Sequence, residues 1–464
     1  MRMPKIVLGV LPTKRHPRDL ATGIEQKERL MKVIRNIDSD IVEIVDLDDV
    51  LEGGIIASID QADAAINKFI NARVDALFIA HTDFGNEQSV SAVAARLNVP
   101  TLVWGADDEA PKTNTHRARD TQCGMFACTK VLSRMGVMFS YIWNVSPETD
   151  DFKKGYDTFI RTVNIVKSVR GLRIAQFGTR PDAFMSVTSN EGELATRYGI
   201  VCVPISHVAI SAETDKIIAE NSPELQEYLA DMTSRMSFGD MEDEYILRHA
   251  AVTLAIESLM KQNGCTVGAM ECWVTGNTLG LGQSRICMNL GELADRGYPI
   301  SCETDINGAV SLAMLRAVGL GRESEFFADL TIRDTQNQNS ELLWHCGPFP
   351  YSLKDPDSPA SVERGREQFK LKTGDITVCR FDELDGKHYL FCGEGKGIDG
   401  PFTTGTYIYF QVSNWKRWEE KLMFGPYIHH VGGVYGNYKA AMREAARYLG
   451  LIFDDPEEQG IYSL

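Results

Sequence analysis

The strongest candidates for chemistry are two carboxylates, Glu303 and Asp305, that follow an apolar strand-like run two residues apart. Side chains at positions i and i+2 of an extended chain share a face, so both carboxylates are predicted to converge on one cation. In open α/β sheets, ligands bind beyond the carboxyl ends of the strands, which is where this segment would lie. The alternative interpretation is that one carboxylate caps the helix predicted to follow, over 309–318.

Three further segments offer side chains that could bind a metal. Glu271 ends the apolar run Val267–Glu271, where an ionised carboxylate is costly unless it is paired or metal-bound; a salt-bridged or edge-exposed Glu is the alternative. His345 also lies in an apolar run, where a hydrogen-bonded core histidine is the alternative to a ligand. His429 and His430 are neighbours on a predicted strand, so at most one of them is expected to reach a given metal. Carboxylates with imidazole are typical of sites for Mn²⁺, Mg²⁺ or Co²⁺.

The elements that position these residues follow from the apolar pattern. Strand-like and helix-like segments alternate in the first part of the chain, which predicts a parallel sheet covered on both faces. The pattern restarts near residue 172, and beyond about residue 326 it becomes typical of antiparallel strands, with a hairpin turn at Asp385-Gly386. The predicted strands are 5–11, 41–45, 76–80, 100–104, 172–177, 200–204, 369–373, 376–381, 387–392 and 406–412, and the predicted helices include 59–71, 88–97, 190–198 and 437–449.

The predicted fold is therefore α/β, with two Rossmann-like doubly wound domains followed by a β-rich C-terminal domain. The predicted boundaries are 1–165 for the N-terminal domain, 166–325 for the second α/β domain with the acidic ligands, and 326–464 for the β-rich domain with the metal-binding histidine.

Composition narrows the function classes. The chain has 464 residues and a formal net charge of -16, which argues against a non-specific nucleic-acid binder. The sequence contains no run of about 18 apolar residues, so we expect no membrane span. The N-terminal apolar stretch is too short for a signal peptide. The ten cysteines include no CxxC pair, so we expect reduced thiols in a cytoplasmic protein.

In the same order along the chain, four segments resemble the L-fucose isomerase and L-arabinose isomerase superfamily. They are Glu303-Thr304-Asp305 with Asn307-Gly308, Phe326-Phe327-Ala328-Asp329-Leu330, Leu343-Trp344-His345, and His429-His430-Val431-Gly432. The similarity covers most of residues 265–450. The resemblance implies the three-domain fold given above and a homo-oligomer, often a trimer or hexamer, with active sites near subunit interfaces.

The resemblance also implies an activity and a ligand set. A Mn²⁺ ion, or another divalent ion such as Mg²⁺ or Co²⁺, would assist an aldose–ketose isomerisation of an open-chain sugar through a cis-enediolate. The fucose isomerase type maps to Glu271, Asp305 and His430 as metal ligands, with Glu271 and Asp305 as acid–base catalysts. Whether Glu271 or Glu303 is the second carboxylate ligand stays open. Additional candidates for metal or substrate contacts are Glu303, His345 and His429.

The predicted sugar contacts are Arg15, His16, Asn86, Trp273 and Trp344. The first two lie in a basic loop, 14–18, at the end of the first strand, where α/β folds bind ligands. In so acidic a chain this loop indicates an anionic sugar, such as a sulfonated or phosphorylated hexose, and superfamily members that act on sulfoquinovose favour the sulfonated one. A neutral fucose- or arabinose-like sugar is the alternative, with the loop simply solvated and the tryptophans packed in the core or an interface.

Two other function classes fit parts of the pattern. A sugar-binding or sensor protein would also have two α/β lobes, but the β-rich third domain argues against it. A metal-dependent aldolase or epimerase shares the enediolate chemistry and would be separated by its products.

Overall fold

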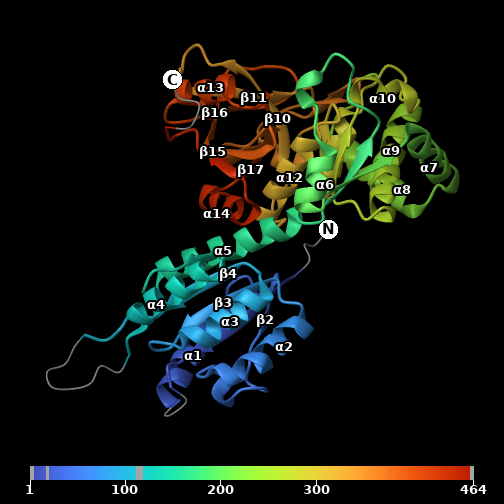
Figure 1. Cartoon of the computed structure of the whole chain (residues 1–464). Helices are drawn as coiled ribbons and strands as arrows, with labels where there is room; N and C mark the ends of the chain where they lie inside the picture. The colour runs from blue at the N-terminus through green and yellow to red at the C-terminus, as the bar shows by residue number, and fades with distance from the viewer. Residues whose placement is uncertain (1–4, 17–19, 111–118, 460–464) are drawn as a thin grey trace. The chain divides into compact units, whose positions relative to one another are not determined.

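The computed structural model describes residues 5–16, 20–110 and 119–459. The chain divides into two compact units, Arg2–Lys167 and Ser168–Leu464 (Figure 1). The first unit ends close to the predicted boundary at residue 165, and the predicted three-way division stays a prediction. Among the described residues, no helix has both the length and the apolar character needed to cross a bilayer.

The N-terminal unit contains a five-stranded sheet in the order β2-β1-β3-β4-β5, and all of its strand pairs are parallel. This order is the one found in flavodoxin-like doubly wound folds. The strands are β1 (Ile6–Thr13), β2 (Val42–Val45), β3 (Ala76–His81), β4 (Thr101–Gly105) and β5 (Phe139–Tyr141), and the helices are α1 (Ala21–Ile34), α2 (Ala62–Ala72), α3 (Glu87–Leu97), α4 (Thr121–Arg134) and α5 (Asp150–Val169).

Helices cover both faces of this sheet, as the apolar strands predict. On one face Phe78 of β3 contacts the rings of Phe152 and Tyr156 in α5. On the other face its neighbour Ile79 packs in a core that includes Phe69 of α2 and side chains of α3 and α4. Alternate strand residues therefore enter two different cores, which is why the strands lack polar alternation.

The C-terminal unit begins with a four-stranded parallel sheet in the order β7-β6-β8-β9. The strands are β6 (Arg173–Phe177), β7 (Val201–Ile205), β8 (Val267–Met270) and β9 (Ile300–Cys302), and the helices between them are α6 (Glu191–Tyr198), α7 (His207–Glu220), α8 (Pro223–Arg235), α9 (Asp243–Gln262), α10 (Cys272–Thr278) and α11 (Cys287–Asp295). The α/β character is confirmed, whereas the description of both sheets as Rossmann-like domains stays a prediction.

A nine-stranded sheet forms the β-rich part of the same unit, in the order β12-β13-β16-β11-β10-β17-β14-β15-β18. An additional pairing of β16 with β15 closes the strands from β16 to β15 into a barrel. The elements are β10 (Phe326–Arg333), β11 (Ser340–His345), β12 (Ser361–Glu363), β13 (Arg366–Lys370), β14 (Gly374–Leu384), β15 (Lys387–Ile398), β16 (Thr406–Gln411), α13 (Trp415–Phe424), β17 (His430–Tyr435), α14 (Lys439–Leu449) and β18 (Ile452–Asp454).

One local feature of this barrel, the hairpin turn at Asp385-Gly386, was predicted from the sequence. The predicted hairpin joins β14 to β15, and both of its turn residues have positive φ, 52° at Asp385 and 71° at Gly386, as a type I′ turn requires. The pairing is not purely antiparallel, however, because β13 runs parallel to β16 and β18 runs parallel to β15.

Helix α12 (Ile306–Val318) is buried along its whole length. It packs against β8 and β9 of the parallel sheet and against β14 and β17 of the barrel, which explains why its sequence is apolar all round. At Gly432 of β17 a Cβ atom would overlap Leu315 of α12. Glycine at this position therefore lets the barrel approach the helix that follows the acidic segment.

Candidate metal centre

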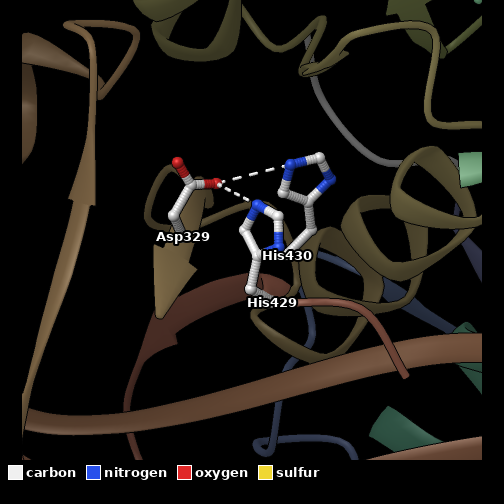
Figure 2. Close-up of side chains that lie close together, drawn as sticks. All are labelled: Asp329, His429 and His430. Atoms are coloured by element: carbon white, nitrogen blue, oxygen red, sulfur yellow. Dashed lines mark ion pairs between the residues drawn. The ribbon is translucent and has the colours of Figure 1, made fainter. Parts of the chain in front are cut away.

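The centre of the site is His430, the first residue of β17. Strand β17 pairs antiparallel with β10 in a register that sets His430 directly opposite Asp329. Cross-strand partners are close enough for their side chains to interact, and His430 Nε2 lies 3.4 Å from Asp329 Oδ1. Figure 2 shows both His430 and its neighbour His429 directed toward the same Asp329 oxygen.

Glu303 approaches the same imidazole nitrogen from the parallel sheet. Its Oε2 lies 3.2 Å from His430 Nε2, and its Oε1 accepts a 3.2 Å hydrogen bond from Trp273 Nε1. Glu303 and Thr304 both have positive φ, 56° and 54°, in a turn closed by the Asp305 N–H donating to Cys302 O. A β-branched residue in this region of backbone space is strained, and such strain clusters at functional sites.

Asp305 lies on the opposite side of the His430 ring. Its Oδ2 is 2.9 Å from His430 Nδ1 and also pairs with Arg380, while its Oδ1 accepts the N–H of Gly308 at 2.8 Å as the N-cap of α12. The predicted proximity of Asp305 and His430 is confirmed, and so is the capping alternative. The i, i+2 rule failed here because residues 303–304 form a tight turn, so the two carboxylates face the two nitrogens of one imidazole.

Two further histidines surround Asp329. The Nε2 atoms of His345 and His429 each lie 3.9 Å from Asp329 Oδ1. His429 and His430 both approach Asp329 although they are neighbours, because His429 lies in a bend before β17 rather than in the strand; which of them would reach a metal stays a prediction. His345 is buried, as the core alternative predicts, and its Nδ1 accepts from Cys346 N at 2.8 Å. Within the described part of the chain its Nε2 has no hydrogen-bond partner.

The charges in this cluster stabilise one another. Burial opposes ionisation of Asp305, but the Arg380 guanidinium and the bond to His430 lower the pKa of that carboxyl well below its usual range. Burial also disfavours a charged His430, yet its contacts with Asp305 and Glu303 raise its pKa to about 9. The pKa of Glu303 is lowered despite burial, through contact with His430 and the nearby His345. Without a cation, the site therefore holds ionised carboxylates around a protonated imidazole.

Aromatic rings form one wall of the cluster. Phe184 stacks on Trp273 and on His429, with ring centroids 6.1 Å and 6.0 Å apart, and meets His430 edge-on at 5.4 Å. Phe327 approaches the His430 ring at 5.0 Å. The sequence analysis did not single out Phe184, because an aromatic residue in a loop carries no local signal of its role.

Glu271, predicted as a metal ligand, caps a helix in the structure. Strand β8 ends at Met270, and Glu271 is the N-cap of α10, accepting from Trp273 N at 3.2 Å and Val274 N at 3.3 Å. Trp273 contacts the cluster because its indole N–H donates a hydrogen bond to Glu303. Trp344 stacks against His345 with centroids 6.3 Å apart and pairs with Asp329 across β10 and β11.

The predicted contacts in the N-terminal unit have local roles there. Arg15 and His16 are exposed, and the Arg15 guanidinium lies 4.2 Å above the Phe84 ring. Asn86 is the N-cap of α3, accepting from Ser89 N, and its amide donates to Ala57 O. The remaining residues of the basic loop, 17 and 18, lie outside the described ranges.

Two carboxylate oxygens, Glu303 Oε2 and Asp329 Oδ1, each approach His430 Nε2, and ligand atoms of Asp329, His429 and His430 all lie within 4.8 Å of one another. Neither of these two oxygens has a hydrogen-bond partner among the described residues. Ligand atoms at about 2.1 Å from a metal and at right angles lie about 3 Å apart, close to the 3.2 Å and 3.4 Å found here. The donor set of two carboxylates and an imidazole fits Mn²⁺. Asp329 stands in one of the family-like segments but was not among the predicted ligands.

Comparison with known proteins supports the resemblance. Residues 9–170 match the family model described as "Fucose/sulfoquinovose isomerase, N-terminal domain". The sulfoquinovose isomerase of Priestia aryabhattai is 24% identical over 411 residues, covering 86% of this chain and 89% of that protein. The sulfoquinovose isomerase of Alkalicoccus urumqiensis is 23% identical, covering 75% of this chain and 77% of that protein.

Among solved structures, an ABC transporter periplasmic solute-binding protein from Actinobacillus succinogenes with bound D-allose is 12% identical and covers 59% of this chain and 79% of that one, with a TM-score of 0.16. A likeness this weak bears on neither fold nor function. The predicted resemblance to the fucose isomerase superfamily is confirmed by the family model and the curated relatives together.

Proposed function

We propose that this protein is a metal-dependent aldose–ketose isomerase that acts on an open-chain sugar, with an anionic, sulfonated hexose as the substrate class. The approach of Glu303 and Asp329 to His430 Nε2, and the close grouping of Asp329, His429 and His430, support the metal centre. The similarity to sulfoquinovose isomerases over most of the chain supports the reaction and the substrate class. We assign Mn²⁺ as the cation on the chemistry of the donors.

In this proposal Glu303, Asp329 and His430 hold the cation. A divalent cation held there would supply Lewis-acid chemistry toward the carbonyl and the adjacent hydroxyl of the sugar. We assign to the carboxylates of Glu303 and Asp329 the transfer of the proton between the two carbons, one as base and the other as acid. The low pKa of Glu303 keeps it ionised and able to accept that proton.

This assignment differs from the ligand set predicted from the sequence, which stays a prediction. Both oxygens of Asp305 already have partners, and those of Glu271 accept from the first N–H groups of α10. We therefore assign to Asp305 the positioning of the His430 ring, because a metal-binding histidine is usually held through its other nitrogen.

The test uses Mn²⁺ content together with product analysis. The wild-type protein should convert a sulfonated aldose to its ketose in D₂O, with deuterium incorporated next to the carbonyl, and EDTA should stop the reaction. Glu303→Gln and Asp329→Asn should lose bound Mn²⁺ and turnover. The matched variant Glu271→Gln should keep Mn²⁺ because its oxygens serve a helix cap. Full Mn²⁺ binding in Asp329→Asn would remove Asp329 from the ligand set.

The same measurements separate the other function classes. An epimerase would give a second aldose and an aldolase would give shorter fragments, whereas an isomerase gives only the ketose. A sugar-binding protein would keep its sugar affinity after EDTA treatment and show no product. The cytoplasmic location and the trimeric or hexameric assembly with sites near subunit interfaces stay predictions.

A further inference from the structure

A small polar pocket opens beside α10 in the C-terminal unit. It has a volume of about 230 Å³ and is lined by Trp273, Gly276, Asn277, Gln283, Ser284 and Arg285. Its shape depends on Gly276, where a Cβ atom would overlap the carbonyl oxygen of Ser284. Glycine at this position allows the loop between α10 and α11 to close against the helix, which brings amide, hydroxyl and guanidinium groups around one space.

Arg285 is the only cationic residue in this lining. Its Nη1 donates to the backbone oxygen of Trp273, and no carboxylate among the described residues lies within ion-pair distance of its guanidinium. Nearby arginines are neutralised, such as Arg248 by Asp215 at 3.0 Å. In a chain with a net charge of -16, an exposed guanidinium without a carboxylate partner attracts anions. Its planar fork of donors matches the oxygens of a sulfonate or phosphate.

Trp273 joins this pocket to the metal centre. Its backbone oxygen accepts from Arg285, and its indole Nε1 donates to Glu303 Oε1 at 3.2 Å. One tryptophan residue therefore separates the guanidinium from a carboxylate of the cluster. Arg285 and Glu303 therefore contact the same residue, one at its backbone and the other at its indole.

We propose that Arg285, with the polar groups of Asn277, Gln283 and Ser284, binds the anionic group on the far end of the sugar while the carbonyl end lies at the metal centre. This inference rests on the proposed function and names the residue that selects an anionic substrate. It differs from the sequence-based prediction, which placed the anion contact in the basic loop of the N-terminal unit. There the Lys14 ammonium is already paired with Asp83 at 2.9 Å.

The test compares three sugars that differ only at the sixth carbon: sulfoquinovose, glucose 6-phosphate and 6-deoxyglucose. We expect Arg285→Gln to lower kcat/KM for the preferred anionic sugar by about 10- to 100-fold relative to 6-deoxyglucose, mainly through KM, because a charge-assisted bidentate contact is lost. The anionic sugar whose kcat/KM falls more, relative to 6-deoxyglucose, shows whether the pocket binds a sulfonate or a phosphate. The matched control is Arg173→Gln, because Arg173 also donates to a backbone carbonyl but is the first residue of β6, at the amino end of the parallel strands, whereas α10 follows the carboxyl end of β8.

An equal loss for the charged and the neutral sugar would overturn the inference and leave the isomerase assignment intact. Calorimetric titration of sulfoquinovose into the Mn²⁺-loaded protein tests sugar binding apart from turnover. If the wild-type protein binds the sugar, Arg285→Gln does not, and neither turns it over, then the pocket stands and the proposed isomerase function falls. Equal binding by both proteins would refute the pocket directly.

Discussion

Replacing Asp305 by Asn tests whether Asp305 binds the metal directly, as the sequence-based ligand set has it, or only positions the His430 ring. Asn keeps the cap of α12, because its side-chain oxygen can still accept from Gly308 N, and Asn and Asp are equally good N-caps. The substitution removes the charge that holds His430 Nδ1 and pairs with Arg380. If Asp305 positions the ligand, Mn²⁺ affinity should fall by about 10- to 100-fold, the usual cost of losing such a partner, or about 1.4–2.7 kcal/mol.

The variant should still fold. Arg380 is fully buried, but Asp382 remains as a partner 2.9 Å from its Nε. We therefore expect a stability cost of about 1–3 kcal/mol, typical of one lost hydrogen bond to a charged group. Removing the arginine itself, as in Arg380→Leu, would leave two carboxylates buried around an uncharged side chain and should cost about 3–5 kcal/mol.

The assay is a calorimetric Mn²⁺ titration of EDTA-stripped protein, with metal content measured after dialysis. Asp382→Asn is the matched control, because Asp382 pairs with the same arginine and with Asn307 rather than with His430. This variant should bind Mn²⁺ with nearly wild-type affinity. A complete loss of Mn²⁺ binding in Asp305→Asn, as severe as in His430→Ala, would make Asp305 a direct ligand and refute the positioning role. Unchanged affinity would show that the ring needs no such support.

Three other outcomes follow from the described residues. Because the pKa of His430 is raised to about 9, Mn²⁺ binding near neutral pH should release a proton, and Mn²⁺ affinity should increase as the pH rises. Calorimetric titrations in buffers of different ionisation enthalpy measure the number of protons released, and a value of zero would contradict this expectation. Burial lowers the pKa of His249 to about 4, so the folded protein holds this side chain neutral. The free energy of unfolding should therefore fall by about 2 kcal/mol between pH 7 and pH 5, because the unfolded chain binds the proton first. In urea unfolding, His249→Gln should show a pH-dependent decrease that is smaller by this amount. Gly432→Ala should lower stability by about 1–3 kcal/mol through overlap with Leu315, seen as a lower Tm, while the open position in Gly192→Ala should tolerate the methyl group.

Local patterns predicted the secondary structure well. The strands and helices around the candidate site depend on short-range signals, such as apolar runs and the Asp385-Gly386 turn, and these need no knowledge of the tertiary structure. The proximity of Asp305 and His430, 125 residues apart, could not come from local spacing. It was predicted only through the resemblance of ordered segments to a known family.

The ligand roles depended on details that the sequence does not encode locally. Asp329 reaches His430 because β10 and β17 pair in one register, and a shift by one residue would turn its side chain to the other face. Glu271 looked like a strand residue, but β8 ends one residue earlier, which converts the carboxylate into a helix cap. Both features depend on a strand boundary or a strand register, and neither is fixed by the types of the residues nearby.

The turn at Glu303 and Thr304 explains how one histidine can be held from two sides. Because both residues adopt positive φ, the chain reverses between β9 and α12, so Glu303 faces Nε2 of His430 while Asp305 faces Nδ1. An extended segment would have set both carboxylates on one side of the ring, leaving the far nitrogen without support. The strain of a β-branched residue in this turn is sustained because α12, buried between the sheet and the barrel, fixes its end. The geometry around His430 and the packing of the C-terminal unit are therefore coupled through a single helix.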